Sequence, residues 1–592
     1  MTPCTLEAIV EPDVPRDVTL CPGTTTFVVT IDEGARLDVT VELADVKRAS
    51  VELRSPDDYY LDGPTWRPTS IEAGAIVTIS GEQRIRIEAD AQLDARITAH
   101  VTPPVGRVLH LAPFGSDTSD GSVAAPWQTW PVALARLVPG DTVIVHDGTW
   151  SETTCDALAQ PCLAGAMMPI VGCPDQAANG TPGFPMTVVA RHQRLAHLVG
   201  DGNGEAFRLS DCDSWVIDGL HVSNRDLANG YGDTIGFYSS PRLIARNLLV
   251  EHPNRCGNDS ALFVAGAPTI DAVVEDSEVY GFHRDGIIVY DTTSATVRRV
   301  FVHSRNTMGL PCYAETYPER GDDGILCYRF MGDTNCVVEN VFAENVVAGF
   351  SDVDSRTLRV SGSIAHDAYF GAVTTSQVAP PSVRTSPVVV ENFVAVGDDV
   401  GIWNRGVQLD ASRVTLVGAR ARSDAAYGDG ANADANGGTT ATTLYRDVLS
   451  IENQFSGFEI SGQASWLIDY SNAYGNVDDY YLGGSSEPID DASGNVQHSM
   501  SVLPTDVGTT ACLVYVPATS NMATAGSTGG PLGAQIIYEL DGGVLTDRKL
   551  WNQRTGAFPC GAIVPSVNDI PGESCFDAHE RVRVGVAGCA IP

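Results

Sequence analysis

Four six-residue stretches decide the fold: Val274-Glu-Asp-Ser-Glu-Val279, Val297-Arg-Arg-Val-Phe-Val302, Val338-Glu-Asn-Val-Phe-Ala343 and Val390-Glu-Asn-Phe-Val-Ala395. Each begins with valine, passes through a polar pair and returns to apolar alternation. Similar stretches begin at Ile217, Val360, Val414 and Ile468. From Val274 the starts lie 23, 41, 22, 30, 24 and 54 residues apart, which fits a coil of 22 to 24 residues carrying insertions. Such a coil cannot bury its own apolar face and must stack on its neighbours, so we predict a parallel β-helix.

The regions on either side of these repeats have a different pattern. In residues 1–104, apolar and polar residues alternate over 26–31, 37–43, 76–79 and 85–89, which is typical of an antiparallel β-sandwich with one wet face. Residues 107–504 form the β-helix in this interpretation. Residues 505–592 contain Cys512, Cys560, Cys575 and Cys589, and we expect a small disulfide-braced capping or anchoring segment with strands near 511–516, 534–539 and 582–587. The predicted fold class is all-β.

Charge and cysteine content limit the possible partners and the compartment. The net charge is −37, which disfavours nucleic acid and anionic membranes. The 14 cysteines include no C-x-x-C pair, so disulfides explain them better than a metal and indicate an exported protein. We expect a monomer, secreted or at the cell surface, whose signal peptide is absent from this sequence. No apolar run is long enough to span a bilayer. Cys4 is expected to pair with Cys21, and Cys312 with Cys327.

The start of the solenoid carries the most specific pattern in the chain. Val108-Leu-His-Leu111 reads as a strand, 125–138 as a short amphipathic helix that covers the open end, and Thr142-Val-Ile-Val145 as the next strand after a Pro-Gly turn. Three cysteines follow in 151–185, which we interpret as a disulfide-braced loop. The string from Val108 resembles the opening of right-handed parallel β-helix proteins of the pectate-lyase-like superfamily. That resemblance implies a right-handed helix and a polysaccharide substrate.

The superfamily includes lyases, galacturonidases and epimerases that act on uronic-acid glycans. Its lyases remove the proton next to a carboxylate, which an arginine, a lysine or calcium must neutralise. A lysine base is excluded here, because Lys47 and Lys549 are the two lysines of the chain. The hydrolase pattern, Gly-His-Gly with paired aspartates, is missing. Of the epimerase string Asp-Pro-His-Asp there is a fragment, Ala365-His366-Asp367. We therefore favour lyase-type β-elimination.

The turns that follow successive repeats concentrate histidine, arginine and acids, a set suited to proton transfer and anion binding. We expect His283 or His303 as the base, Arg284 or Arg305 to neutralise the substrate carboxylate, and Tyr313 or Tyr317 as the acid. The expected substrate-binding residues are His252, Arg255, Arg320 and His366. The insertion from Asn306 to Gly324 supplies oxygen ligands for calcium, and the expected set is Glu315, Glu319, Asp322 and Asp323. No organic cofactor is expected.

Two alternatives stay open. Aspartate or asparagine before glycine is also ordinary turn chemistry, so each of these residues has a structural interpretation. The whole solenoid could then be a non-catalytic surface or matrix protein that binds glycans or serves as a spacer, which the net charge favours. The stretch Asp429-Gly-Ala-Asn432-Ala-Asp434-Ala-Asn436-Gly437 resembles half of a calcium loop, but the closing acid is absent, and we predict a flexible polar loop there.

Overall fold

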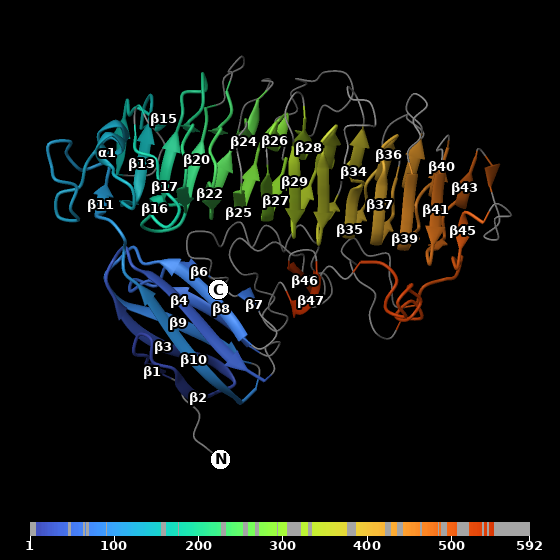
Figure 1. Cartoon of the computed structure of the whole chain (residues 1–592), viewed down its shortest axis with the longest axis horizontal. Coiled ribbons are helices and arrows are strands. Elements are labelled where there is room, and N and C mark those ends of the chain that lie inside the picture. Colours follow the sequence, from blue (N-terminus) through green and yellow to red (C-terminus); the bar gives the residue numbers. More distant parts are fainter. Residues whose placement is uncertain are drawn as a thin grey trace.

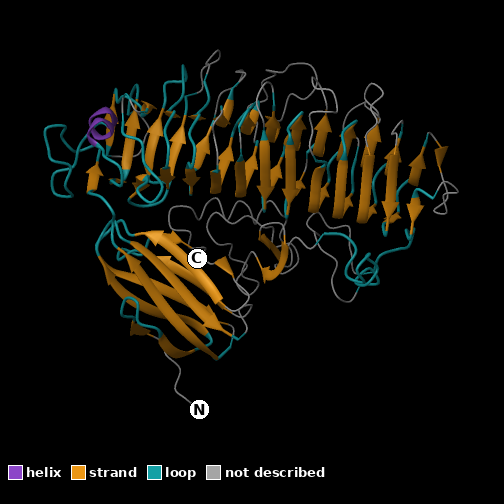
Figure 2. Ribbon diagram, in the orientation of Figure 1, coloured by secondary structure: helices purple, strands orange, loops and turns teal. Residues whose placement is uncertain are grey.

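The protein is a long β-helix with a β-sandwich beside its first half (Figures 1 and 2). The computed structural model describes residues 7–44, 49–62, 65–66, 70–89, 91–155, 161–173, 175, 177–225, 232–252, 259–266, 271–292, 294–304, 321–329, 334–366, 368–375, 386–420, 428–434, 442–461, 465–483, 485–486, 494–505, 520–534, 538–541 and 544–549. Within these residues one helix, α1 (Trp130–Arg136), accompanies the strands. It is too short to cross a membrane, and the described residues contain no other candidate.

Two five-stranded sheets make the sandwich. One has the order β1 (Glu7–Ile9), β3 (Gly23–Ile31), β9 (Gly81–Ala89), β5 (Ala49–Arg54), β6 (Tyr60–Asp62), and the other β2 (Arg16–Leu20), β10 (Leu93–Thr102), β4 (Arg36–Leu43), β8 (Ser70–Ile76), β7 (Thr65–Trp66). The alternation predicted for 26–31, 37–43 and 85–89 is confirmed. The strand expected over 76–79 is wrong, because β8 ends at Ile76 and residues 77–79 lie outside any strand.

Two long sheets form the β-helix among the described residues. The 22-stranded sheet contains β11 (Val108–Leu111), β12 (Thr142–Val145), β13 (Gly148–Ser151), β14 (Cys162–Ala164), β16 (Met186–Ala190), β17 (Ala196–Val199), β19 (Trp215–Asp218), β20 (Leu220–Ser223), β22 (Ile244–Arg246), β23 (Leu249–Glu251), β25 (Ala272–Tyr280), β27 (Ala295–His303), β29 (Asn335–Glu339), β30 (Phe342–Glu344), β32 (Thr357–Ser361), β33 (Ile364–His366), β35 (Val388–Val396), β37 (Leu409–Val417), β39 (Thr442–Ile451), β41 (Ser465–Asp469), β42 (Asn472–Tyr474) and β45 (Val496–Gln497).

The 13-stranded sheet contains β15 (Ile170–Gly172), β18 (Phe207–Ser210), β21 (Ile235–Tyr238), β24 (Ser260–Ala265), β26 (Asp285–Tyr290), β28 (Gly321–Tyr328), β31 (Val346–Val353), β34 (Phe370–Thr375), β36 (Val400–Arg405), β38 (Asp429–Asp434), β40 (Ser456–Ile460), β43 (Asp478–Leu482) and β44 (Ser485–Ser486). Neighbouring coils pair in parallel in both sheets, apart from the antiparallel pair β43–β44. The predicted right-handed parallel β-helix is confirmed.

The polar pair in each repeat is a corner of the coil. Its second residue adopts a left-handed backbone, with φ of 50° at Asp276, 54° at Asn340 and 51° at Asn392. Asparagine and aspartate tolerate this conformation better than other residues with a Cβ. The corner divides each repeat into two strand segments of the 22-stranded sheet, and the turn after the second segment leads into the 13-stranded sheet. Apolar residues from all three segments fill the interior of the coil.

Chain outside the coils packs on the solenoid at its first coil and, near its last coils, on the outer face of the 22-stranded sheet. At the first coil Trp130 of α1 lies edge-on to Trp150, 5.8 Å between ring centres, and both rings are fully buried, as the predicted capping helix requires. Near the last coils Met522 and Leu532 pack on Leu449. Of the strand expected over 534–539, Tyr538 and Glu539 lie in β46 (Tyr538–Asp541), which pairs with β47 (Val544–Lys549), and residues 535–537 lie outside the described residues. The other two expected C-terminal strands and the four C-terminal cysteines lie outside the described residues.

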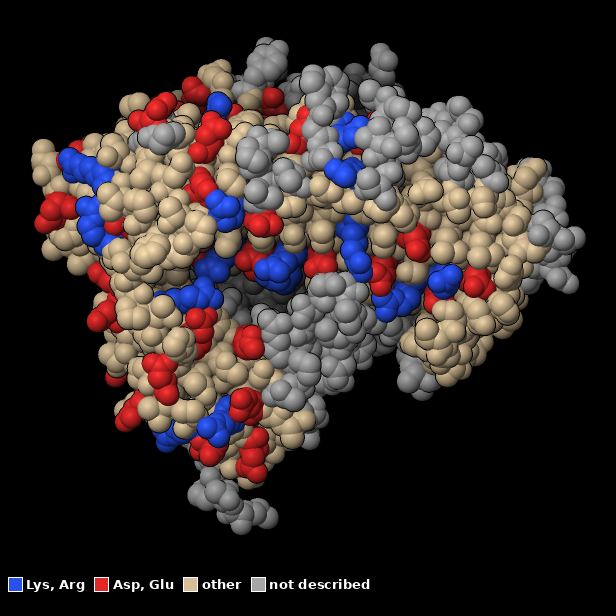
Figure 3. All heavy atoms as spheres, in the orientation of Figure 1, with Lys and Arg blue, Asp and Glu red and all other residues tan. Residues whose placement is uncertain are grey.

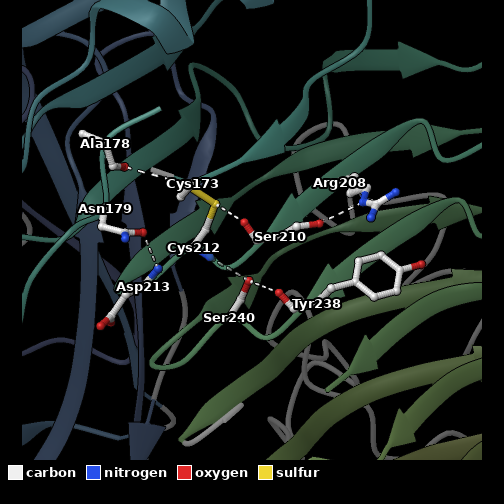
Figure 4. Close-up of a disulfide and its surroundings, with 9 residues drawn as sticks. All are labelled: Cys173, Ala178, Asn179, Arg208, Ser210, Cys212, Asp213, Tyr238 and Ser240. Carbon is white, nitrogen blue, oxygen red and sulfur yellow. Dashed lines mark hydrogen bonds between the residues drawn. A yellow bond between two sulfur atoms is a disulfide. The ribbon is translucent and has the colours of Figure 1, made fainter. Parts of the chain in front are cut away.

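Three disulfides join described cysteines: Cys155–Cys162, Cys173–Cys212 and Cys327–Cys336. The first two brace the region after β13, as expected, and the second is drawn in Figure 4. The expected pairing of Cys312 with Cys327 is wrong. Cys327 is the next-to-last residue of β28 and Cys336 the second residue of β29, so the bridge joins two consecutive strands. Cys21 is also disulfide-bonded.

Candidate functional site

Two rows of side chains point outward from the 13-stranded sheet, and we call them the outer lane. The register places Arg208, Gly236, Phe263, Ile288, Leu326, Ser351, Val373 and Trp403 in the first row, and Ser210, Tyr238, Ala265, Tyr290, Tyr328, Val353, Thr375 and Arg405 in the second. Successive members of a row belong to successive coils, about 4.8 Å apart. The lane therefore repeats along the solenoid axis.

Four half-buried aromatic side chains form a continuous strip in this lane. The ring centres of Tyr238 and Phe263 are 5.6 Å apart, those of Phe263 and Tyr290 5.9 Å, and those of Tyr290 and Tyr328 5.2 Å. Aromatic faces are apolar surfaces on which the C–H faces of sugar rings stack. The coil spacing is close to the length of one sugar unit in an extended chain, so a glycan running along the axis meets one rung per unit.

Tyr238 is held in place by carboxylates at the edge of the sheet where its strands begin. Its hydroxyl donates to Glu205 at 3.0 Å and to Asp233 at 3.2 Å. The ring lies over Gly236, where a Cβ would come within 2.5 Å of it. Burial, with Asp259 and Glu205 nearby, raises the pKa of Asp233 to about 7, against a hydrogen bond from the amide of Ser260 that lowers it. Burial also raises the pKa of Tyr238.

His283 and Arg284 lie in the turn that leads into β26, at this same edge of the 13-stranded sheet. His283 is 7% exposed, and burial lowers its pKa, so its imidazole is neutral at neutral pH and able to accept a proton. Arg284 pairs with the buried Asp285, 3.2 Å between Nε and Oδ2. His252, in the preceding turn, accepts or donates a hydrogen bond with Thr234 at 2.7 Å. Burial and the charge of His283 lower its pKa to about 4.

The other two predicted histidines lie on a different face. His303 alternates with the core residue Val302 and points out from the second segment of the 22-stranded sheet, where its Nε2 is 3.0 Å from Glu278. His366 occupies the same row two coils further on, with Nδ1 2.9 Å from Glu344. The structure thus brings His252 and His283 together and separates both from His303 and His366. Paired with buried glutamates, His303 and His366 have a structural role in this arrangement.

Most of the predicted insertion lies outside the described residues. Seven predicted site residues, from the insertion and from outside it, are not described, so their roles stay predictions: Arg255, Arg305, Tyr313, Glu315, Tyr317, Glu319 and Arg320. Asp322 and Asp323 are described, and both fall within β28, which begins at Gly321, whereas the insertion was expected to continue to Gly324. Among the described residues no group of three or more His, Cys, Asp and Glu side chains could hold a metal ion. Calcium therefore remains an expectation.

The sequence interpretation missed a polar group at the far end of the outer lane. The predicted flexible loop is the strand β38, where Asp434 accepts a hydrogen bond from the indole of Trp403 at 3.1 Å. On the next strand Glu459 is hydrogen-bonded to Asp429. Burial and this neighbour raise the pKa of Glu459 to about 7. The small and polar residues that alternate over 429–434 were the available signal, because outward side chains of a strand recur at every second position.

Comparison with known proteins identifies no family for this chain. No family model matches the chain. The uncharacterized protein YwoF of Bacillus subtilis (strain 168) is 24% identical over 141 residues, which are 23% of this chain and 26% of YwoF. The match spans about a quarter of that relative.

Two solved structures give the structural likeness. Pectate lyase Pel9A is 16% identical, with 72% of this chain and 96% of that chain covered and a TM-score of 0.40. The catalytic domain of a GH87 alpha-1,3-glucanase in complex with nigerose is 13% identical, with 82% and 92% covered and a TM-score of 0.42.

Proposed function

We propose that this protein is a secreted enzyme that binds an extended polysaccharide along the outer lane and cleaves uronic-acid units by β-elimination. The observation that carries the proposal is the strip of four aromatic rings, Tyr238, Phe263, Tyr290 and Tyr328, spaced along the axis. The three disulfides among described cysteines support an oxidising compartment. The similar solved structures include enzymes that act on polysaccharides, in agreement with this substrate class.

His283 is the proposed base and Arg284 the proposed partner of the substrate carboxylate. The imidazole is neutral at neutral pH because burial lowers its pKa, so it can take the proton next to the carboxylate. Asp285 begins β26 and Ile288 of the outer lane follows three residues later, about 10 Å along the strand, so this turn lies at the edge of the sheet that carries the lane. The guanidinium of Arg284 would stabilise the negative charge that develops on the carboxylate as the proton leaves.

The test is a search for unsaturated products. Each β-elimination creates a conjugated double bond that absorbs ultraviolet light. We expect the absorbance to rise when the protein is incubated with alginate, pectate or a glycosaminoglycan, with calcium supplied in one arm and chelated in the other. The arms show whether calcium takes part. Absorbance that stays flat on every substrate would exclude the lyase mechanism.

A non-catalytic glycan-binding protein is the second candidate function. The aromatic strip needs no chemistry in order to bind sugars, and the net charge of −37 opposes a polyanionic substrate away from local arginines. Binding of glycans measured by calorimetry, together with the absence of any product, would decide for this candidate.

A further inference from the structure

The charges in the outer lane follow a pattern that the aromatic strip does not explain. Of its sixteen positions, all of them described, two carry a charged side chain, and both are arginines: Arg208 at one end and Arg405 at the other. The chain as a whole has 74 acidic and 37 basic residues. The two rows continue beyond these arginines, to Ile170 and Gly172 on β15 and to Asn432 and Asp434 on β38. Between Arg208 and Arg405 they carry no acid, and an uncharged stretch bounded by two cations is complementary to an acidic polymer.

Both arginines are stacked on aromatic rings of the lane. The guanidinium of Arg208 lies 4.7 Å from the ring centre of Tyr238, and that of Arg405 lies 4.6 Å from Trp403. Figure 4 shows Arg208 and Tyr238 side by side on neighbouring strands, close to the Cys173–Cys212 bridge. A guanidinium over an aromatic ring is attracted to the face of the ring and can still donate hydrogen bonds to a carboxylate.

Neither arginine is consumed by a close ion pair that the structure records. The Nε of Arg208 donates to Ser210 at 2.9 Å, its nearest carboxylate, Glu205, is 3.9 Å away, and the side chain is 40% exposed. Within the described residues the buried Nε of Arg405 has no hydrogen-bond partner. A ligand carboxylate would accept charge-assisted hydrogen bonds from these arginines, and such bonds are stronger than neutral ones.

Beyond Arg405 the lane becomes acidic. Asp434 follows Arg405 in the second row, and Glu459 lies on the following strand in the first row. Carboxylates at this point repel an anionic chain, so we expect the bound part of such a chain to end near Arg405. From β18 to β36 it covers eight strands, or about 34 Å at ~4.8 Å per strand-to-strand step.

We propose that the outer lane measures chain length: Arg208 and Arg405 bind carboxylates at the two ends of an acidic polysaccharide segment of about eight units, one for each strand. This inference rests on the proposed function, because it assumes a glycan on the lane. It adds two specificity-determining residues and a minimum length. Shorter acidic oligomers reach one arginine, and the aromatic strip from Tyr238 to Tyr328 contributes stacking to acidic and neutral chains alike.

The experiment is a calorimetric titration of the whole protein with oligouronates from tetramer to dodecamer, and with the same oligomers after reduction of their carboxyl groups. We expect the affinity for oligouronates to rise steeply between hexamer and octamer and then level off. Arg208→Gln and Arg405→Gln should each weaken the octamer about tenfold and remove the steep rise. Binding of the reduced oligomers should change less than twofold.

Arg136→Gln is the matched control, because Arg136 also lies over an aromatic ring, 5.4 Å from the centre of Trp127, but outside the lane. It should bind every oligomer as the unaltered protein does. A length-independent affinity, or equal losses for acidic and reduced oligomers, would overturn the length measurement and leave the glycan site intact. An unaltered protein that binds none of the oligomers would refute the proposed function itself.

Discussion

The outer lane and the corner of the 22-stranded sheet both run the length of the solenoid, but they handle charge in opposite ways. At the corner, arginines and acids alternate from coil to coil: Arg246 lies 2.8 Å from Asp218, and Arg298 lies 2.6 Å from Glu275. Figure 3 shows basic and acidic side chains following one another along the side of the solenoid that faces the sandwich. A cleft of about 380 Å³ separates this corner from Arg36, Asp38 and Glu72 of the sandwich.

Between Arg208 and Arg405 the lane, by contrast, carries no carboxyl group, and burial raises the pKa values of Asp233 at its edge and Glu459 beyond its far end. Neutralised charges at the corner stabilise the stacking of coils, because each partner sits on the next rung. Charged side chains in the lane that lack such partners can pair with the charges of a ligand. The difference teaches that a repeated row of charges in a solenoid indicates a ligand site when its pairs are incomplete, and a structural seam when they are complete.

The largest effect should come from the two histidines that the fold separates. His283→Ala should lower the rate of β-elimination by about a hundredfold to ten-thousandfold, because a general base contributes on this order. His303→Ala should leave the rate per folded molecule unchanged and lower stability, because it deprives the buried Glu278 of its partner. Initial rates followed by ultraviolet absorbance, with thermal melting as the second readout, compare them. Equal loss of rate in both variants would contradict the assignment of His283 as the base and of His303 as a structural residue.

The second-largest effect is expected from a substitution in the charged corner of the 22-stranded sheet. Glu275→Gln removes the carboxylate that both Arg298 and Arg299 contact, and Glu275 is 7% exposed, so we expect a loss of about 2–3 kcal/mol in the free energy of unfolding. Asp58→Asn is the control, since Asp58 is half-exposed beside Arg84 and Arg86 and should cost less than about 1 kcal/mol. Urea unfolding measures both. Similar losses would mean that the corner is no more than a solvated surface.

A smaller effect is expected from the aromatic strip. Tyr290→Ala should weaken glycan binding about tenfold, because it removes one stacking face from the middle of the strip. Tyr470→Ala is the comparison, because Tyr470 stacks on His498 at 4.5 Å, outside the lane, and should bind glycans normally. Calorimetry with a long oligomer gives both affinities. Unchanged binding by the Tyr290 variant would remove the observation on which the proposed function depends.

The smallest effect concerns pH. The pKa values of Asp233 and Glu459 are both raised to about 7, chiefly by burial, so these carboxyls are neutral below that pH. Asp259, Glu205 and Tyr238 face Asp233, while Asp429 and Asp434 face Glu459. As the pH rises through 7, both become charged at the ends of the lane, and binding of an acidic glycan should weaken a few-fold. Binding of a neutral glycan should stay constant. An acidic glycan that binds equally at pH 6 and pH 8 would contradict this assignment.

The raised pKa values of Asp233 and Glu459 also make the stability of the folded protein depend on pH. Their folded pKa values exceed the ordinary values of 3.8 and 4.5, so the folded protein binds more protons than the unfolded chain between those values and about 7. Stability from these groups is therefore greatest at low pH within this window and falls as the pH rises through it. Glu459→Gln should reduce that slope.

Particular residues show how far the sequence could be interpreted. The stretches beginning at Val274, Val297 and Val390 are strands with a corner at the polar pair, because the corner requires a left-handed residue and local chemistry selects it. The same residues could not indicate which face His303 would take. That depends on where the corner falls, since one residue of displacement moves a side chain from one face to the other. The strand at 429–434 was misread as a loop for a related reason: its glycine and alanines give little apolar signal.

The amino-acid sequence by itself determined the repeat, the all-β class, the sandwich pattern before residue 104 and the acidity, because each follows from local periodicity and composition. The tertiary structure alone decided which distant residues share a row. Arg208 and Arg405 are nearly two hundred residues apart, and no local pattern connects them. Stacking of successive coils places one residue of each coil above the next, and this long-range register turned scattered side chains into a lane with two charged ends.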